Sequence, residues 1–123
     1  LAIELELVNQ ICHFQNFPEE FFRTLRTNGF VVDGTLFRCP VTLDPLSFAE
    51  LDREVRHPLH GKSSFHVGHL TPLKTRGQHV PGNVSWFSVN GNRIQGNLSI
   101  EETRRLLGRM FGNYRDLGID IET

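Results

Sequence analysis

Apolar residues recur at helical spacing near the start of the chain, at Ile3, Leu7, Ile11 and Phe14. This period predicts a helix over the first part of the sequence. Pro18 and the two glutamates after it are typical of a second helix start, because acidic groups are favourable at the positive end of the helix dipole. The second helix should reach about Thr27 and end at Asn28-Gly29.

Five apolar side chains around this second helix are expected in the core, namely Phe17, Phe21, Phe22, Leu25 and Phe30. Aromatic clusters of this kind are more often packing than base-stacking platforms. Two short strands are predicted over 30–32 and 36–39, around the turn pair Asp33-Gly34. The next segment could form a short helix over 47–56, with Ser47 as its N-cap and Pro58 as its end.

The second half predicts a strand over 65–70, a long polar connection, and a second strand over 84–89. A loop with two glycines should follow. Ser99 and Glu102 then form a capping box for a last helix. Its apolar face should consist of Ile100, Leu106, Leu107 and Met110. The class is therefore α+β, with N-terminal helices and a short hairpin followed by a C-terminal strand–strand–helix unit.

Composition is that of an ordinary globular chain, with 38% apolar and 22% charged residues. The length of 123 residues predicts one domain, with a supporting region over 1–60 and the strand–strand–helix unit over 61–112. No apolar run approaches the roughly 20 residues that span a bilayer, and the first residues do not resemble a signal peptide. Cys12 and Cys39 are expected to be reduced thiols, so we expect a cytoplasmic protein without membrane contact.

Charge is distributed unevenly. Residues 1–54 hold nine acids and four Lys or Arg, whereas 55–100 hold no acid. The basic residues of that window are Arg56, Lys62, Lys74, Arg76 and Arg93, and five of the six histidines lie in it as well. An acid-free window of this length predicts a positive surface suited to an anionic ligand.

Three polar residues mark the ends of the elements in this window. His69 ends the first strand, Asn83 ends the polar connection, and Asn92 lies between the second strand and the last helix. Phosphodiester hydrolysis needs a base for water and a stabiliser for negative charge. A neutral imidazole suits the first task, and a divalent cation held by an amide oxygen and water suits the second.

The run HVGHLTPLKTRGQHVPGNVSWFSVNGNRIQGN, residues 66–97, resembles the motif of the HNH (ββα-metal) endonucleases, in particular restriction endonucleases. The resemblance implies that His69 is the general base, that Asn83 fixes the loop, and that Asn92 is a metal ligand. Asn90 is the alternative to Asn92. The implied cofactor is Mg²⁺ or Mn²⁺, and the implied products carry 5′-phosphate and 3′-hydroxyl ends.

Many members of this family place an acid before the base, where this chain has Gly68. The sequence GHLTP resembles instead the Asp-Arg-Gly-His version found in non-specific nucleases, with His66 where their aspartate stands. His66 is therefore the second candidate metal ligand. Gln95 stands where the family commonly has a lysine. The expected nucleic-acid contacts are Lys74, Arg76, His79, Arg93 and Gln95.

A structural zinc is not expected, because the chain lacks paired Cys-x-x-Cys motifs, and Cys39 with His57 and His60 matches no standard spacing. The sequence thus predicts a metal-dependent endonuclease acting on DNA, with RNA left open as a substrate. Two alternatives are an inactive HNH-like module that binds nucleic acid and a non-specific nuclease or toxin. A double-strand cut at one site would need a homodimer.

Overall fold

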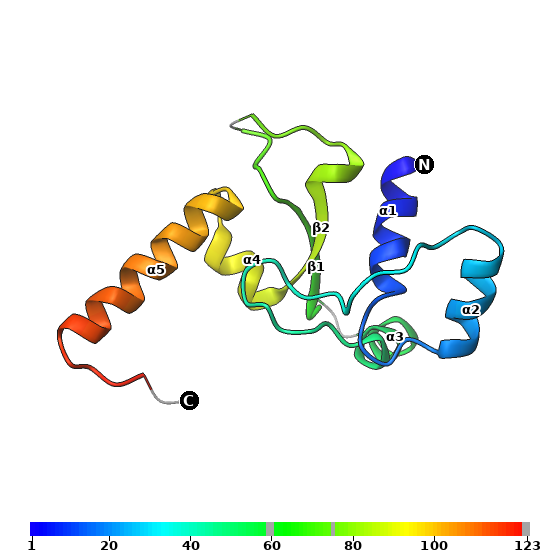
Figure 1. Ribbon diagram of the computed structural model, residues 1–123, viewed down its shortest axis with the longest axis horizontal. Coiled ribbons are helices and arrows are strands. Elements are labelled where there is room, and N and C mark those ends of the chain that lie inside the picture. The colour runs from blue at the N-terminus through cyan, green and yellow to red at the C-terminus, as the bar shows by residue number, and fades with distance from the viewer. Residues whose placement is uncertain (59–60, 75, 122–123) are drawn as a thin grey trace.

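A computed structural model describes residues 1–58, 61–74 and 76–121 and confirms the α+β class (Figure 1). In chain order its elements are α1 (Ala2–Ile11), α2 (Glu19–Thr27), α3 (Phe48–Arg56), β1 (Phe65–His69), the 3₁₀ turn η1 (Pro81–Asn83), β2 (Val84–Ser88), α4 (Val89–Gln95) and α5 (Ile100–Asp116). Within the described ranges, none of the helices is both long and apolar enough to cross a membrane.

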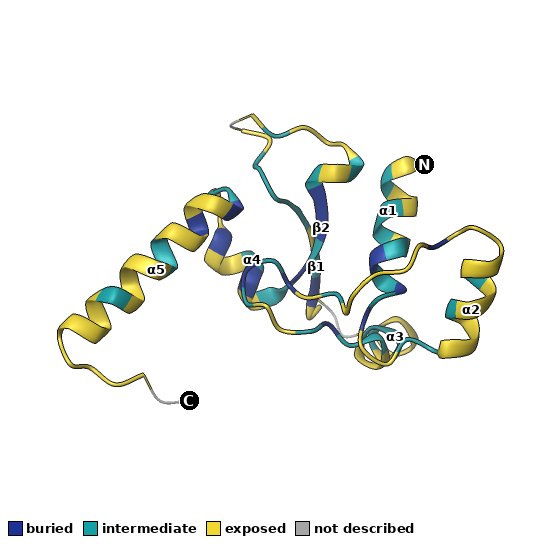
Figure 2. Ribbon diagram, viewed as in Figure 1, coloured by how far each residue is buried: buried dark blue, intermediate teal, exposed yellow. Residues whose placement is uncertain are grey.

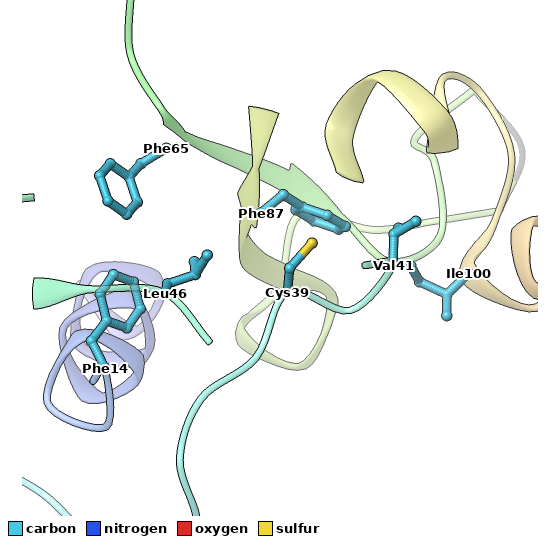
Figure 3. Packing of buried hydrophobic residues seen from close by; sticks show 7 residues of the cluster. All are labelled: Phe14, Cys39, Val41, Leu46, Phe65, Phe87 and Ile100. Atoms are coloured by element: carbon cyan, nitrogen blue, oxygen red, sulfur yellow. The ribbon is translucent and has the colours of Figure 1, made fainter. Parts of the chain in front are cut away.

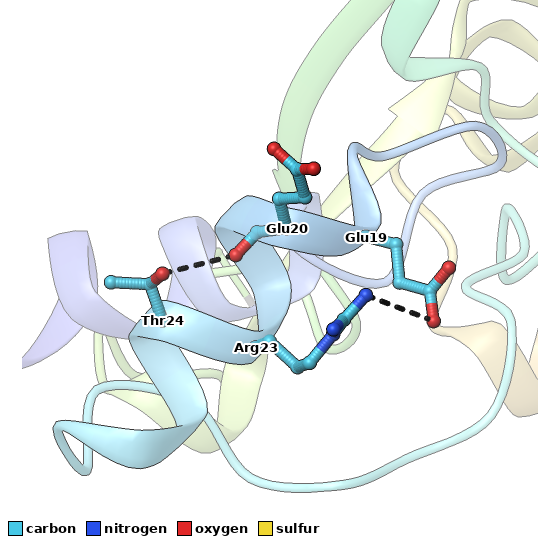
Figure 4. A network of polar contacts seen from close by, with 4 residues as sticks. All are labelled: Glu19, Glu20, Arg23 and Thr24. Atoms are coloured by element: carbon cyan, nitrogen blue, oxygen red, sulfur yellow. Dashed lines mark hydrogen bonds and ion pairs between the residues drawn. The ribbon is translucent and has the colours of Figure 1, made fainter.

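The first three helices lie where the sequence predicted them. Ser47 caps α3 by accepting a hydrogen bond from the backbone N–H of Glu50 at 3.2 Å. Helix α2 ends at Gly29, whose φ of +76° lies in the left-handed region that glycine adopts without strain. Along its exposed face, Arg23 pairs with Glu19 at 3.6 Å and Thr24 donates to the carbonyl of Glu20 (Figure 4). Contacts one turn apart therefore support this helix locally.

The predicted strands over 30–32 and 36–39 are not present. This segment runs as extended chain and contributes one isolated bridge, between Arg38 and Pro45. The Phe37 N–H donates to the carbonyl of His13 at the end of α1, 2.9 Å away. The backbone partner of Phe37 is therefore a residue just after α1, and not the opposite arm of a hairpin.

The expected aromatic core around α2 is also wrong in part. Phe21 and Phe30 are 63% and 66% exposed. Phe17 and Phe22 are half-buried, against Phe48 and His13 respectively, and Leu25 is half-buried as well. Figure 2 shows α2 as an exposed helix at the periphery, so only one of its faces has neighbours to pack against.

The core itself combines residues from both halves of the chain. Its buried members are Phe14, Cys39, Val41, Leu46, Phe65, Phe87 and Ile100 (Figure 3). Phe87 on β2 and Cys39 have no exposed surface, and Cys12 is a second buried, unpaired cysteine. Burying this set removes apolar surface from water, which is the main favourable term in folding, and it anchors the β1–β2 pair against the N-terminal region.

Strands β1 and β2 form an antiparallel pair whose register runs from Phe65 opposite Ser88 to His69 opposite Val84. Helix α1 covers the outer edge of β2 with one side chain, Gln10. Its amide nitrogen donates to the Val84 carbonyl at 3.1 Å, and its amide oxygen accepts from the Trp86 N–H at 3.0 Å. The edge is thus satisfied by a buried glutamine rather than by a third strand.

The segment after β2 was predicted as a loop but forms the short helix α4. Ser88 is its N-cap and accepts from the Gly91 N–H at 3.0 Å. Gly91 lies so close to the core that a Cβ there would be 2.4 Å from the Cys39 sulfur. The Asn-Gly pair that suggested a turn instead serves close packing, and tertiary contact outweighs the poor helix propensity of these residues.

Helix α5 begins at the predicted capping box, with Ser99 and Glu102 bonded reciprocally at 3.0 and 3.1 Å. Its N-terminal part is anchored, through buried Ile100 and Thr103 and through Leu107, which packs against the core. Leu106 and Leu107 are half-buried and Met110 is 43% exposed. The expected apolar face therefore meets the core at one end only, and the rest of the helix projects away from the β1–β2 pair (Figure 2).

Candidate functional site

Asn83 closes the loop between the two strands. Its side-chain oxygen accepts from the Thr71 N–H at 2.8 Å, and its amide nitrogen donates to the carbonyls of Thr71 and Gln78, each at 2.9 Å. One half-buried amide thereby ties the beginning of the loop to its return. These contacts are the loop fixing that the HNH resemblance implied, and they leave Asn83 as a scaffold of the site.

His69 stands at the end of β1 and is held from beneath by Gln95 of α4. The Gln95 amide nitrogen donates to the His69 carbonyl at 2.9 Å, and a longer contact of 3.4 Å reaches the next carbonyl. Gln95 is only 4% exposed, so the expected contact with nucleic acid is not what the structure shows. Its buried amide instead fixes the backbone that carries His69.

Asn92 lies one turn before Gln95 and faces the same strand end. Its side-chain oxygen is 3.6 Å from the position that a Cβ at Gly68 would occupy. An amide oxygen therefore lies beside the residue that directly precedes His69. The predicted metal ligand therefore lies next to β1, beside the backbone position that precedes the predicted base.

Gly68 has little room for the acid that many HNH enzymes carry at this position. A Cβ there would lie 3.2 and 3.3 Å from two ring carbons of Phe87, a fully buried side chain. Such distances are tighter than ordinary packing contacts, so a larger residue would have to displace the core. The phenylalanine ring beneath the strand thus accounts for the glycine.

His66 is the second predicted metal ligand. It is half-buried and pairs across the strands with Phe87. Because side chains alternate along a strand, His66 and Gly68 share a face, about 7 Å apart. His66 therefore lies on the Asn92 side of β1, and its role as a ligand stays a prediction.

His79 comes back over the strand end from the far side of the loop. Its Nδ1 lies 2.9 Å from the Nε2 of His69, and the two rings meet edge to face with centroids 5.2 Å apart. The sequence predicted a phosphate contact for His79. The residue instead contacts the predicted base. The two histidines are ten residues apart and joined by a loop without regular structure, so the sequence did not predict this contact.

The predicted phosphate contacts Lys74, Arg76 and Arg93 are exposed. Among the described residues, no ion pair involves them, whereas Arg56 of the same window pairs with Asp52. Arg93 directly follows Asn92 on α4. Three cations around the loop and α4 are therefore available for an anionic ligand.

The side chains near the strand end bear on which cation the chain could hold. Over 1–58, 61–74 and 76–121, no three His, Cys, Asp or Glu side chains gather in a metal-binding group. The Asn92 amide oxygen is a ligand type that fits Mg²⁺ or Mn²⁺, which retain several waters. His60, of the grouping considered for zinc, lies outside the described residues. Cys39 is buried and accepts a hydrogen bond from the Ser88 hydroxyl at 3.4 Å.

No family model matches the chain, and no curated protein matches it. Among solved structures it is similar to a crystal structure of a type II restriction endonuclease, with a TM-score of 0.66 and 16% sequence identity. The match covers 93% of this chain and 50% of that one, so the chain spans half the length of that enzyme. At this identity the likeness concerns the fold, and the fold resembles that of a type II restriction endonuclease.

Proposed function

We propose that this chain is a metal-dependent endonuclease of the HNH type that hydrolyses DNA phosphodiester bonds. One observation carries the proposal: the side-chain oxygen of Asn92 lies beside Gly68, the residue directly before His69, at the end of the β1–β2 pair. The fold shared with a type II restriction endonuclease supports DNA as the substrate. Exposed cations lie beside the site, and such cations favour binding of the phosphate backbone of DNA.

His69 is the general base. Its Nε2 is engaged by His79, so the nitrogen left for catalysis is Nδ1. That nitrogen accepts a proton from the attacking water as the new bond to phosphorus forms. Gln95 and Asn83 hold the strand end and the loop still, which keeps the ring in position during the reaction.

Asn92, with His66 as the second candidate, would hold Mg²⁺ or Mn²⁺. Such an ion, when bound, supplies electrostatic stabilisation of the negative charge on the phosphate and on the leaving 3′ oxygen. Lys74, Arg76 and Arg93 would hold the flanking phosphates by their charge.

The first prediction concerns His69→Ala. Incubation of supercoiled plasmid with the wild-type chain and Mg²⁺ or Mn²⁺ should give nicked or linear product. The variant should cleave at least ~100-fold more slowly, because general-base catalysis contributes about 10²- to 10⁴-fold. Its thermal unfolding should stay close to that of the wild type, since the ring is at the surface end of the strand. Gln78→Ala, an exposed side chain of the same loop, is the matched control.

A His69→Ala variant with near-normal cleavage would reject the assignment of the base. A wild-type chain that shifts DNA on a gel without nicking it, at any divalent cation tested, would support the inactive binding module instead. The absence of an acid at Gly68 is the observation that favours this alternative. Equal degradation of RNA would point to a non-specific nuclease, and linear rather than nicked product would indicate paired copies.

A further inference from the structure

The hydrogen bond between the two histidines constrains where their protons lie. Each neutral imidazole carries one N–H and one lone pair. At 2.9 Å, one proton lies between the Nε2 of His69 and the Nδ1 of His79. One ring therefore donates and the other accepts.

The two arrangements differ in chemistry. If His79 donates, the proton of neutral His69 resides on Nδ1, and that nitrogen cannot accept another from water. If His69 donates through Nε2, its Nδ1 carries a lone pair that points away from the bond. Only the second arrangement provides a base, since the hydrogen bond made by one ring nitrogen sets the state of the other.

We propose that His79 is a positioning residue that accepts the Nε2 proton of His69 and thereby keeps Nδ1 of His69 free to deprotonate the attacking water. This inference rests on the proposed nuclease function. His79 does not touch the substrate; it acts through the ring orientation and the tautomer of His69.

The proton balance is complete without a further reactant. Water gives a proton to Nδ1 of His69 as its oxygen bonds to phosphorus. The bond from phosphorus to the 3′ oxygen breaks, and that oxygen keeps the electron pair and takes a proton from solvent. His69 is then an imidazolium, and its Nε2–H still donates to neutral His79 in a stronger, charge-assisted bond.

The loop is built to hold His79 in this place. Asn83 donates to the carbonyl of Gln78, the residue directly before His79, at 2.9 Å. Gly77 donates to the Pro72 carbonyl at 3.0 Å. A Cβ at Gly77 would lie 1.9 Å from the Thr71 carbonyl oxygen, so the two arms of the loop approach more closely than any other residue would permit. The neighbours of His79 are thus fixed although its own ring is exposed.

Solution NMR of the full chain with ¹⁵N-labelled histidine tests the hydrogen bond directly. We expect a scalar coupling between Nε2 of His69 and Nδ1 of His79, with the one-bond N–H coupling on Nε2. In His79→Ala the coupling should vanish, and the Nε2 proton should exchange rapidly with water. A proton found on Nδ1 of His79, or no coupling in a folded wild-type chain, overturns the proposal.

Steady-state cleavage of a DNA duplex separates positioning from phosphate binding. His79→Ala should lower kcat about 10- to 100-fold with little change in KM. His79→Asn should recover much of this loss, because an amide oxygen accepts the Nε2 proton. His79→Arg, which keeps a phosphate contact but accepts nothing, should not recover it. Rescue by Arg and not by Asn, or a loss confined to KM, would overturn the positioning role.

The outcomes distinguish this inference from the nuclease proposal. A wild-type chain that cleaves no DNA overturns the nuclease function and with it the catalytic use of the histidine pair. An active chain without the coupling, or with an unaffected His79→Ala variant, overturns the role of His79 alone.

Discussion

Gly68 shows how packing limits the residue type at one position. Gly68 of β1 lies against the ring of Phe87 and near the side-chain oxygen of Asn92. The ring of this core aromatic favours glycine, whereas the Asn92 oxygen, 3.6 Å from the Cβ position, would tolerate a larger residue. The residue that departs from the usual HNH pattern is therefore determined by packing.

Gly68→Ala should destabilise the fold. The added Cβ would meet two ring atoms of Phe87 at 3.2 and 3.3 Å, and the buried ring can shift only by disturbing its neighbours. We expect a loss of about 1–3 kcal/mol in the free energy of unfolding, as for other overpacked cores, measured by denaturant unfolding. Gly82→Ala is the control, since a Cβ there has no neighbour within 4 Å. Equal stability of the two variants would show that Phe87 does not confine position 68.

At the level of elements, three side chains of α4 point in three different directions. Asn92 faces β1, Arg93 faces solvent, and Gln95 reaches inward to the His69 carbonyl. A second connection lies at the other end of β1. The Glu54 carboxylate of α3 accepts from the Ser63 hydroxyl and from the Ser64 N–H, and so it fixes the entry of the strand. Both ends of β1 are thus held by helices.

Glu54 should make the stability depend on acid. Burial disfavours its ionised form, but hydrogen bonds from Ser63 and Ser64 outweigh burial and lower the pKa of Glu54 below its ordinary 4.5. The stabilisation is therefore complete above about pH 4.5 and is lost as the pH falls through the lower pKa of the folded state. Glu54→Gln should lose about 1 kcal/mol at pH 7, because these hydrogen bonds are partly exposed to water.

Denaturant unfolding at pH 7 and at pH 3 measures this dependence. The difference in stability between the two pH values should be smaller in Glu54→Gln than in the wild type. Glu50→Gln makes the same change at an exposed position of α3 and should leave the difference as it is. A Glu54 variant that keeps the full acid dependence would contradict the role of these hydrogen bonds.

On the scale of the whole molecule, the chain is open. Its accessible surface is 8858 Å², whereas a compact chain of this mass would expose about 6,700 Å². Much of the excess lies on α2 and α5, where Phe21, Phe111 and Leu117 are more than half exposed. The charges have a pattern as well: the loop and α4 carry exposed cations that no described acid neutralises.

Binding of DNA should therefore depend strongly on salt. With divalent cations removed, the logarithm of the association constant should fall linearly with the logarithm of salt concentration. Replacing Lys74, Arg76 or Arg93 by alanine should reduce the magnitude of that slope by about 1 each. Arg23→Ala, which removes a cation paired with Glu19 on α2, should leave the slope unchanged. A slope insensitive to the three loop and α4 cations would exclude them from the interface.

Local patterns were sufficient wherever neighbouring residues determine the structure. The periodicity of α1, the glutamates that open α2, and the serine caps of α3 and α5 act within one or two turns, so the sequence alone determined these helices. The strands predicted over 65–70 and 84–89 are present as β1 and β2. The HNH resemblance of residues 66–97 indicated His69, Asn83 and Asn92 as candidate site residues.

Only the tertiary structure decided the rest, because the partners are distant in the chain. The segment over 30–39 forms no hairpin, because its Phe37 N–H donates to the carbonyl of His13, just after α1, and α4 forms because Gly91 packs on Cys39. Gln95 and His79, both expected at nucleic acid, turn instead toward His69 from 26 and 10 residues away. The sequence identified the candidate side chains, and long-range packing and hydrogen bonding determined which of them are in contact.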